Sequence, residues 1–368
     1  MKIIGILFTM VFTCVLSALC FENTKEIENS FLKNNIKKPS RNLEKRERLS
    51  RLSRYSCDDL VAFTKQIEIP GFPLAFNPSI LRTKEGLVMV FRYAPDRRYE
   101  WNSYIGVVEL NENLELASEP TLLDTRFGNR IIPSQSEDAR MILYKDEIYL
   151  TYNDSEVARW PTDTQSHKRD MYIAKLVKRD GNWELETATK LFHETDERLW
   201  QKNWIPFIWN QQMLLVYTTT PFEVVRPNLS HGDCRIFSRT MPKIRWDFGE
   251  PRGGTPALPI DGKYLSFFHS SKPMMSKVAK KNYLQHFYMG AYLFDATPPF
   301  AISHITPFPI LAKEFYTDSE VDKRVVFPGG FVEAGPYFYV IYGKDDREIW
   351  IAAVDKKKLL ASMVRVKS

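Results

Sequence analysis

The sequence predicts an all-β protein, a five-bladed β-propeller preceded by a signal peptide and a basic polar N-terminal segment. Beyond Phe63, short β-branched or aromatic runs alternate with polar turn residues, and long helical periodicity is hard to find. Within that body, residues 63–368, one hairpin pattern of equal length recurs five times. Equal repeats several tens of residues apart are typical of propellers. A two-sheet sandwich, the alternative, would not require equal hairpins.

Residues 1–20 have the pattern of a signal peptide, because one Lys precedes an uninterrupted apolar run that ends in small residues. We therefore expect a protein that is secreted or resides in the secretory pathway or periplasm. The alternative is a membrane anchor at residues 3–20, since about 18 apolar residues can span a bilayer. The mature chain then keeps Cys57 and Cys234, and their spacing does not say whether they pair. Cys and His do not cluster with metal-ligand spacing, so no metal site is expected.

Residues 21–62 form a basic linker or N-terminal extension. Between Phe21 and Arg54, ten Lys or Arg oppose five acidic residues, and with Lys2 this balance accounts for the whole formal charge of +6. The rest of the chain is formally neutral, so a nucleic-acid partner is not expected. The segment itself is predicted to be a solvated linker, with attachment to an anionic or membrane surface as the alternative. Nothing in the sequence predicts the oligomeric state.

Each hairpin spans fourteen positions from an opening residue to a closing aromatic, across a central polar or glycine turn. A more variable stretch with further strand-like runs, such as SYIGVVEL or MYIAKLV, follows each hairpin. If that stretch adds two strands, each unit has the four strands of a propeller blade. The hairpins run from Asn77 to Phe91, Asp138 to Tyr152, Asn203 to Tyr217, Gly254 to Phe268, and Pro328 to Tyr342.

The opening residues should lie together at one mouth of the central channel, where propellers bind ligands. Among them Asp138 is the sole carboxylate. Hydrolysis of a glycoside requires two carboxylates, but phosphate is already an anion and needs cations to hold it. Residues just after the closing aromatics form a second set at the same end: Arg92, Asn153, Thr218, His269 and Gly343. Cationic side chains at or near these ends are Arg92, Arg140, Arg159, Lys202, Arg252 and His269.

The segment SEDAR, residues 136–140, resembles the Glu-Asp-Pro-Arg segment of glycoside hydrolase family 130, with Ala139 in place of Pro. That family comprises β-mannoside phosphorylases and mannosidases, together with the related mannosyltransferase-phosphorylases. The similarity spans about Phe76 to Ala353 and continues in RGGTPALPIDGKYLSFFH, MGAYLFDATPPFAIS, and VVFPGGFV with YGKDD. Ala139, Arg252 in place of Lys, and the segment LWQKNWIPF indicate a divergent member.

The resemblance implies a five-bladed propeller that cleaves or forms a β-mannosidic bond with inversion, with inorganic phosphate as co-substrate and no other cofactor. It makes Asp138 the general acid acting on an oligosaccharide or glycan. Phosphate would be held by Arg159, Arg252 and His269. Together with the register, it places substrate contacts at Asn77, Arg92, Arg140, Asn153, Asp154, Lys202, Asn203, Tyr342 and Asp346. Trp101, Trp204 and Tyr342 either stack on sugars or pack in the core.

Three alternatives stay open. A mannosidase would need a second carboxylate, with four candidates: Glu137, Asp154, Glu223 and Asp346. A mannosyltransferase would bind a nucleotide sugar where the cations converge. A non-catalytic glycan-binding propeller would keep the aromatics and tolerate loss of the acid. Asn153 and Asn228 each begin an N-glycosylation sequon, and a glycan on Asn153 would obstruct the predicted mouth.

Overall fold

The computed structural model describes residues 60–129, 133–156, 168–275, 283–316 and 323–367, all within the unit Cys57–Ser368. Strands dominate these residues, which confirms the prediction of an all-β body. The helices are short: η1 (Arg97–Tyr99), η2 (Lys313–Phe315) and α3 (Lys356–Ser362). The strands are β1 (Val61–Ile67), β2 (Ala75–Arg82), β3 (Leu87–Tyr93), β4 (Tyr104–Leu110), β5 (Thr121–Leu122), β6 (Glu137–Tyr144), β7 (Glu147–Asp154), β8 (Asp170–Arg179), β9 (Asn182–His193), β10 (Ile205–Trp209), β11 (Gln212–Thr219), β12 (Phe222–Pro227), β13 (Asp233–Thr240), β14 (Leu258–Ile260), β15 (Lys263–Met275), β16 (Tyr283–Asp295), β17 (Ile302–Ile305), β18 (Lys323–Arg324), β19 (Val326–Ala334), β20 (Tyr337–Lys344), β21 (Glu348–Asp355) and β22 (Val364–Arg365).

Most of these strands form antiparallel meanders. Strands β2 to β5 make one sheet, and β14 to β17 make another, extended by β22 and β18. An eight-stranded sheet joins two meanders, β6 to β9 and β10 to β13, through a parallel pairing of β9 with β13. The last sheet has the order β1-β21-β20-β19, so the first strand of the body pairs with a strand near its end.

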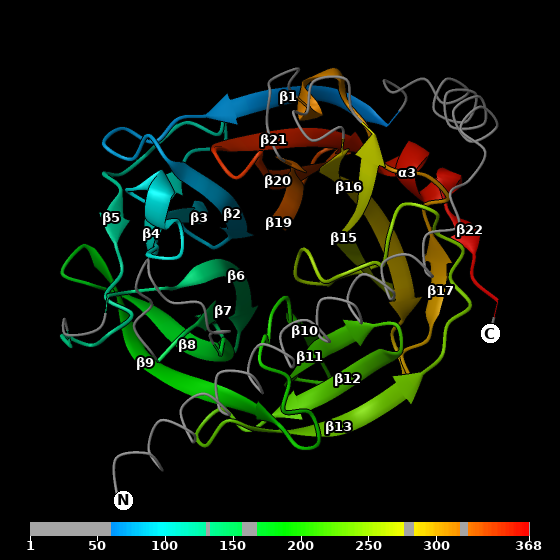
Figure 1. Cartoon of the computed structure of the whole chain (residues 1–368), viewed down its shortest axis with the longest axis horizontal. Helices are drawn as coiled ribbons and strands as arrows, with labels where there is room; N and C mark the ends of the chain where they lie inside the picture. Colours follow the sequence, from blue (N-terminus) through cyan, green and yellow to red (C-terminus); the bar gives the residue numbers. More distant parts are fainter. Residues whose placement is uncertain (1–59, 130–132, 157–167, 276–282, 317–322, 368) are drawn as a thin grey trace, which may run out of the picture. The chain divides into compact units, whose positions relative to one another are not determined.

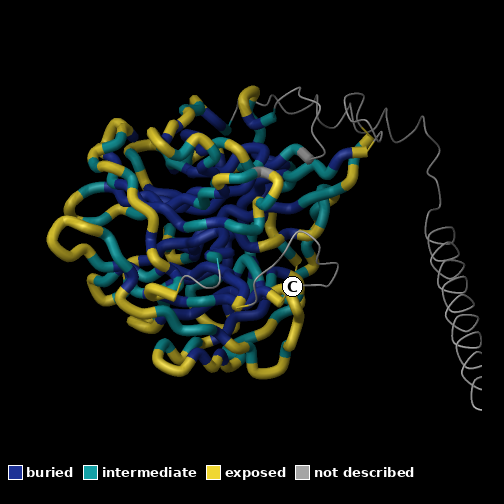
Figure 2. The backbone as a smooth tube through the Cα atoms, turned by 60° about the vertical axis from the view of Figure 1, so that its left-hand side comes forward, coloured by how far each residue is buried: buried dark blue, intermediate teal, exposed yellow. Residues whose placement is uncertain are grey.

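The sheets stand around a common centre, with β2, β6, β10 and β19 toward it (Figure 1). Strand β2 contacts β6 and β19, β6 contacts β10, and β15 contacts β19. The sheet that contains β10 is joined to the sheet that contains β14 by a hydrogen bond of 3.1 Å from the Ala257 N–H, just before β14, to the Pro206 carbonyl in β10. Buried backbone fills the interior of this unit and exposed backbone marks the turns (Figure 2). The inner strand of each meander therefore contributes its opening residue to one shared central region.

The strand pairings match the repeated hairpins predicted from the sequence. Pro328 pairs directly with Tyr342 in β19 and β20. In β6 and β7 the neighbouring pair is Glu137 with Asn153, one position outside the predicted pair of Asp138 and Tyr152. The register of β2 with β3 agrees in the same way, since Phe76 pairs with Arg92. In β10 and β11, Ile205 pairs with Val216, which is one position away from the predicted register. The pairs Arg252 with His269 and Leu258 with Leu265 lie on either side of the predicted pair of Gly254 and Phe268. The sequence spacing therefore identifies the hairpins and their opening positions.

A backbone distortion recurs at the opening positions. Asn77, Asp138 and Asn203 have φ values of 45°, 54° and 63°, in the left-handed region where Asn and Asp are the best tolerated residues after glycine. The pairing register shifts beside Asn77, beside Asp138 and after Pro328. Each shift marks a β-bulge, which bends the strand and redirects a side chain. The same device thus shapes the inner ends of different units.

Glycine is required where the inner segments approach one another. A Cβ on Gly253 would lie 2.0 Å from the Asn203 carbonyl oxygen, and one on Gly329 would lie 1.9 Å from that of Pro78. No side chain fits at such distances, so these positions require glycine if the backbones are to pack this closely. Close packing at the centre brings polar side chains from different sheets within hydrogen-bonding reach.

The closing aromatics of the hairpins are core residues. Phe91, Tyr152, Tyr217, Phe268 and Tyr342 are all buried and belong to the apolar clusters that separate the sheets. The regular placement of an aromatic at this position therefore serves the packing of sheet against sheet.

Several sequence predictions fall on residues outside the described ranges. The leader, almost all of the basic segment, Cys57 and Arg159 are among them. Cys234 is a buried free thiol, and burial raises its pKa to about 12. Across the described ranges, no helix is long and apolar enough to span a bilayer.

Candidate active site

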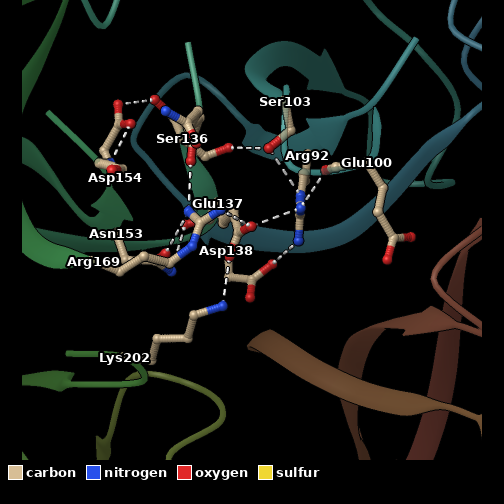
Figure 3. Close-up of polar contacts among 12 residues, drawn as sticks. Arg92, Glu100, Ser103, Ser136, Glu137, Asp138, Asn153, Asp154, Arg169 and Lys202 are labelled. Carbon is tan, nitrogen blue, oxygen red and sulfur yellow. Dashed lines mark hydrogen bonds and ion pairs between the residues drawn. The ribbon is translucent and has the colours of Figure 1, made fainter. Parts of the chain in front are cut away.

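The candidate site is built on the first two residues of β6. In a regular strand, neighbouring side chains point to opposite faces. At Asp138 the positive φ and the register shift between Glu137 and Arg140 break that alternation. Both carboxylates consequently reach the guanidinium of Arg92 from β3, at 2.8 Å for Glu137 Oε1 and 3.6 Å for Asp138 Oδ1 (Figure 3).

Asp138 is buried, at 7% exposed, yet it is lightly bonded. Asn77 Nδ2, from the equivalent position of the neighbouring sheet, donates a hydrogen bond of 2.9 Å to Asp138 Oδ1. The contact with Arg92 Nη1 at 3.6 Å also falls on Oδ1. Oδ2 has no hydrogen-bond or ion-pair partner among the described residues, so one oxygen of this carboxylate is available for proton transfer.

Glu137 is bonded very differently, because three cations hold it. Its Oε1 lies 2.8 Å from Arg92 Nη2 and 2.8 Å from Arg169 Nη2, and its Oε2 lies 2.7 Å from Lys202 Nζ (Figure 3). Burial alone would raise the pKa of Glu137, but Arg92, Lys202 and Arg169 together lower it to about 2. Glu137 is therefore a permanently charged ion-pair partner near neutral pH, and both of its oxygens are occupied.

Arg169 is a site residue that the sequence reasoning missed. It is 4% exposed, and its Nη1 donates to the Gln135 carbonyl at 2.9 Å and to Asn153 Oδ1 at 3.3 Å. It lies just before β8, and its backbone forms a parallel bridge with Trp200. Because that position is outside the hairpin repeat, the spacing argument gave no signal for it.

Arg140 was predicted to contact substrate, and the structure assigns its donors elsewhere. The side chain is 1% exposed. It donates to the carbonyl oxygens of Gly254 at 2.5 Å and Asp138 at 2.6 Å, and to Asn203 Oδ1 at 3.0 Å. Burial lowers the pKa of Arg140 to about 10. Arg140 is thus a central tie between inner strands that holds the backbone of Asp138, and Asn203 is one of its acceptors.

The pair Asn153 and Asp154 at the end of β7 is also buried, at 1% and 2% exposed. Asn153 accepts from Arg169, while Asp154 accepts from Arg126 Nη2 at 2.8 Å and from Ser136 Oγ at 2.7 Å. Burial, the largest influence, raises the pKa of Asp154 despite Arg126. Both residues are thus bonded to other residues of the protein, through Arg169, Arg126 and Ser136. Because Asn153 is buried and bonded, it is no acceptor for a glycan in the folded protein.

The predicted phosphate ligands Arg252 and His269 face each other across a backbone bridge, with hydrogen bonds of 2.7 and 3.2 Å. Arg252 is exposed, and its guanidinium has no hydrogen-bond or ion-pair partner within the described part of the chain. His269 is 3% exposed, and burial, aided by Arg140 and Arg252, lowers its pKa to about 3. His269 is therefore neutral, which leaves Arg252 to supply charge.

For two of the three aromatics expected either to stack on sugars or to pack in the core, the structure favours the core. Tyr342 is 0% exposed and Trp204 1%, and each lies in an apolar cluster, so neither ring presents a face to solvent. Trp101 is half-buried and packs edge-on against Tyr99. An exposed indole instead belongs to Trp200, and the Lys202 ammonium lies 5.1 Å from its ring centre.

The other carboxylates predicted as candidates for a second catalytic group are largely engaged. Glu223 is bonded through Oε1 to His193 Nε2 at 2.8 Å, and its Oε2 lies 3.4 Å from Arg239 Nε. Asp346 follows β20 and interacts with Arg92: burial would lower the pKa of Arg92, but Glu137, Asp138 and Asp346 raise it. Among the described residues, no group of His, Cys, Asp and Glu could hold a metal ion.

Known structures share this architecture. A β-1,2-mannobiose phosphorylase from Listeria innocua is 16% identical with a TM-score of 0.53, and the alignment covers 84% of this chain and 98% of that one. A mannose phosphorylase from Leishmania mexicana, in complex with phosphate, is 13% identical with a TM-score of 0.56, covering 88% and 96%. A glycosyl hydrolase from Bacteroides ovatus is 15% identical with a TM-score of 0.56, covering 77% and 84%.

At these identities the likeness shows the fold alone, which is β-propeller-like. No curated protein matches the sequence closely. The sequence itself matches the family model of glycoside hydrolase family 130, described as β-1,4-mannooligosaccharide phosphorylase, over residues 39–365. That match covers nearly the whole chain, and the chain belongs to glycoside hydrolase family 130.

Proposed function

We propose that this chain is an inverting β-mannoside phosphorylase in which Asp138 is the general acid. The observation that carries the proposal is the free oxygen of Asp138. Its Oδ1 faces Asn77 and Arg92, while Oδ2 has no partner among the described residues. By contrast, both oxygens of Glu137 are ion-paired, and both oxygens of Asp154 are hydrogen-bonded.

The reaction follows from this division of roles. Asp138 donates its proton to the leaving oxygen as the bond between that oxygen and the mannosyl C1 breaks. A phosphate oxygen attacks C1 from the opposite face and forms the new bond, so a β-mannoside yields α-mannose 1-phosphate. No second carboxylate is needed to activate water. The Arg252 side chain is exposed and its guanidinium has no hydrogen-bond or ion-pair partner among the described residues, so it is the group that binds phosphate beside the neutral His269.

The proposal also includes the number of propeller blades, the cellular location and the substrate. We count the meanders β2 to β5, β6 to β9, β10 to β13, β14 to β17, and β19 to β21 with β1 as five propeller blades. The leader predicted at residues 1–20 would direct the protein to the secretory pathway or periplasm, or anchor it in a membrane. An oligosaccharide or glycan is the substrate. Asn77 and Arg92 contact the acid directly, and Lys202 is bonded to its neighbour Glu137.

A hydrolase is the second candidate. One related structure is described as showing that the family of mannoside phosphorylases contains hydrolases that target β-1,2 mannosidic linkages. Hydrolysis with inversion would require a base about 6.5 to 9.5 Å from Asp138. Asp346, which lies close enough to Arg92 to influence its pKa, is the carboxylate for that role.

The test is phosphate dependence. The full chain without its leader is incubated with β-1,2- and β-1,4-mannobiose, with and without inorganic phosphate, and the products are identified by ³¹P and ¹H NMR. Phosphorolysis gives α-mannose 1-phosphate only when phosphate is present. Equal rates of mannose release without phosphate would overturn the phosphorylase assignment in favour of a hydrolase.

A further inference from the structure

Glu137 organises the cations around Asp138. Arg92, Arg169 and Lys202 come from three separate segments of the chain, and each places a nitrogen 2.7 to 2.8 Å from a Glu137 oxygen. We propose that Glu137 is a positioning residue whose charge holds these cations and offsets them, so that its neighbour Asp138 can carry the proton it donates. The inference rests on the proposed role of Asp138 as general acid.

The bonding of Arg92 supports this role. Its Nη2 donates to Glu137 Oε1 at 2.8 Å and to the Glu100 carbonyl at 2.7 Å, and its Nε donates to Ser103 Oγ at 3.1 Å. Its contact with Asp138 is longer, at 3.6 Å. Arg92 is therefore hydrogen-bonded to Glu137, while its ion pair with Asp138 is longer. Without Glu137, the same guanidinium would be free to shorten its ion pair with the acid.

The local charge balance leads to the same conclusion. Arg92, Arg140 and Arg169 all interact electrostatically with the Asp138 carboxylate, and Lys202 reaches the site through Glu137. The opposing acids nearby are Glu137, Asp346 and Glu100, which act on Arg92, and Asp154, which acts on Arg169. A carboxylate facing uncompensated cations loses its proton more readily. Removing the charge of Glu137 would therefore favour the charged form of the neighbouring carboxylate.

The β-bulge in β6 explains how the adjacent residues Glu137 and Asp138 can both reach Arg92. Because the positive φ at Asp138 and the register shift beside it cancel the usual alternation, both carboxylates approach Arg92. One of them is fully bonded and fixed in charge. The other keeps a free oxygen. A regular strand would direct one of the two away from the site.

The test uses Glu137→Gln, which removes the charge and nearly preserves the shape. The pH dependence of kcat/KM for β-mannobiose cleavage is measured for the wild type and the variant. We expect the half-maximal point on the alkaline side to move to lower pH by about one unit. Glu109→Gln is the matched control, because Glu109 bonds Lys178 and the Trp183 indole at 3.0 Å, away from Asp138. Its profile should equal that of the wild type.

Two outcomes would overturn the inference. One is an unchanged pH profile in Glu137→Gln, even with lower stability, since this would show a purely structural role. The other is an unchanged titration midpoint for the carboxyl carbon of Asp138, followed by NMR in protein labelled with ¹³C-aspartate and assigned with Asp138→Asn. The inference requires this midpoint to fall in Glu137→Gln and to stay constant in Glu109→Gln. This second measurement needs no turnover, so it stands apart from any failure of the phosphorylase proposal.

Discussion

Asn77 and Asp138 occupy the same position in neighbouring units and are joined by a hydrogen bond of 2.9 Å between Asn77 Nδ2 and Asp138 Oδ1. Both have the left-handed backbone conformation, as does Asn203 in the next unit. Three of the five opening positions thus share this backbone conformation, and of these one holds an acid and two hold amides. Asn77 and Asn203 show that this backbone conformation also accommodates an uncharged amide side chain.

Asp138→Asn should slow catalysis strongly without harming the fold. Asn already occupies this conformation at Asn77 and Asn203, so the variant should have an unchanged melting temperature. The rate of β-mannobiose cleavage should fall by about 10² to 10⁴, the usual contribution of a general acid. Asp146→Asn, at an exposed turn position with a φ of 61°, is the control and should leave the rate unchanged. A fully active Asp138→Asn would refute the assigned acid.

Arg252→Gln should weaken the use of phosphate selectively. Because Arg252 is exposed and bonded to no described side chain, its loss should not affect stability. A charged hydrogen bond to phosphate accounts for about a tenfold change in affinity. The KM for phosphate should rise by about that factor while the KM for the mannoside stays constant. Arg226→Gln, another exposed arginine, should change neither constant. A phosphate KM unaffected by Arg252→Gln would remove this residue from the site.

Arg140→Lys should destabilise the whole unit. A lysine cannot reproduce the three directed hydrogen bonds to Gly254, Asp138 and Asn203, and buried acceptors left unpaired are costly. We expect the free energy of unfolding, measured by urea titration, to fall by about 3 kcal/mol. Arg82→Lys alters an exposed pair with Glu112 and should cost less than about 0.5 kcal/mol. Equal losses in the two variants would contradict the role of a central tie.

His269 should make the protein sensitive to acid. Burial lowers its folded-state pKa from 6.5 to about 3, so between these values the unfolded chain binds a proton that the folded chain excludes. Stability should accordingly fall as the pH drops from 6.5 toward 3. His269→Phe replaces the imidazole that lies near Phe327 and Phe287 with a ring that does not titrate, and it should reduce that fall in melting temperature. His231→Phe, at an exposed position, should retain the wild-type dependence. An unaltered slope in His269→Phe would contradict the burial argument.

The spacing of residues was sufficient to predict the hairpins and to single out Asp138. A step of fourteen residues is a local property, fixed by strand length and turn, and the pairing of Pro328 with Tyr342 reproduces it. Arg169 could not be found this way, because its role depends on a backbone bridge to Trp200 that no repeat predicts.

The roles of the buried residues also escaped prediction. Arg140 satisfies its donors on carbonyls more than a hundred residues away, and a sequence does not display which carbonyls will be exposed to a side chain at the centre. Similarly, the residue type of Tyr342 fits both a sugar platform and a core. Its 0% exposure decides for the core. Burial, which depends on the packing of sheets from different parts of the chain, settled both cases.

The pairing of β1 with β21 has a consequence for the order of synthesis. Val61 pairs with Val354, and Ile67 pairs with Ile349. Strand β1, the first of the body to be synthesised, therefore stays unpaired until β21 has been synthesised. Until residues near Asp355 are made, β1 has no partner in its sheet and the circle of sheets stays open. A product that ends before Glu348 would therefore expose the edge of β1 along its length, and the ring can close only after β21 has been made.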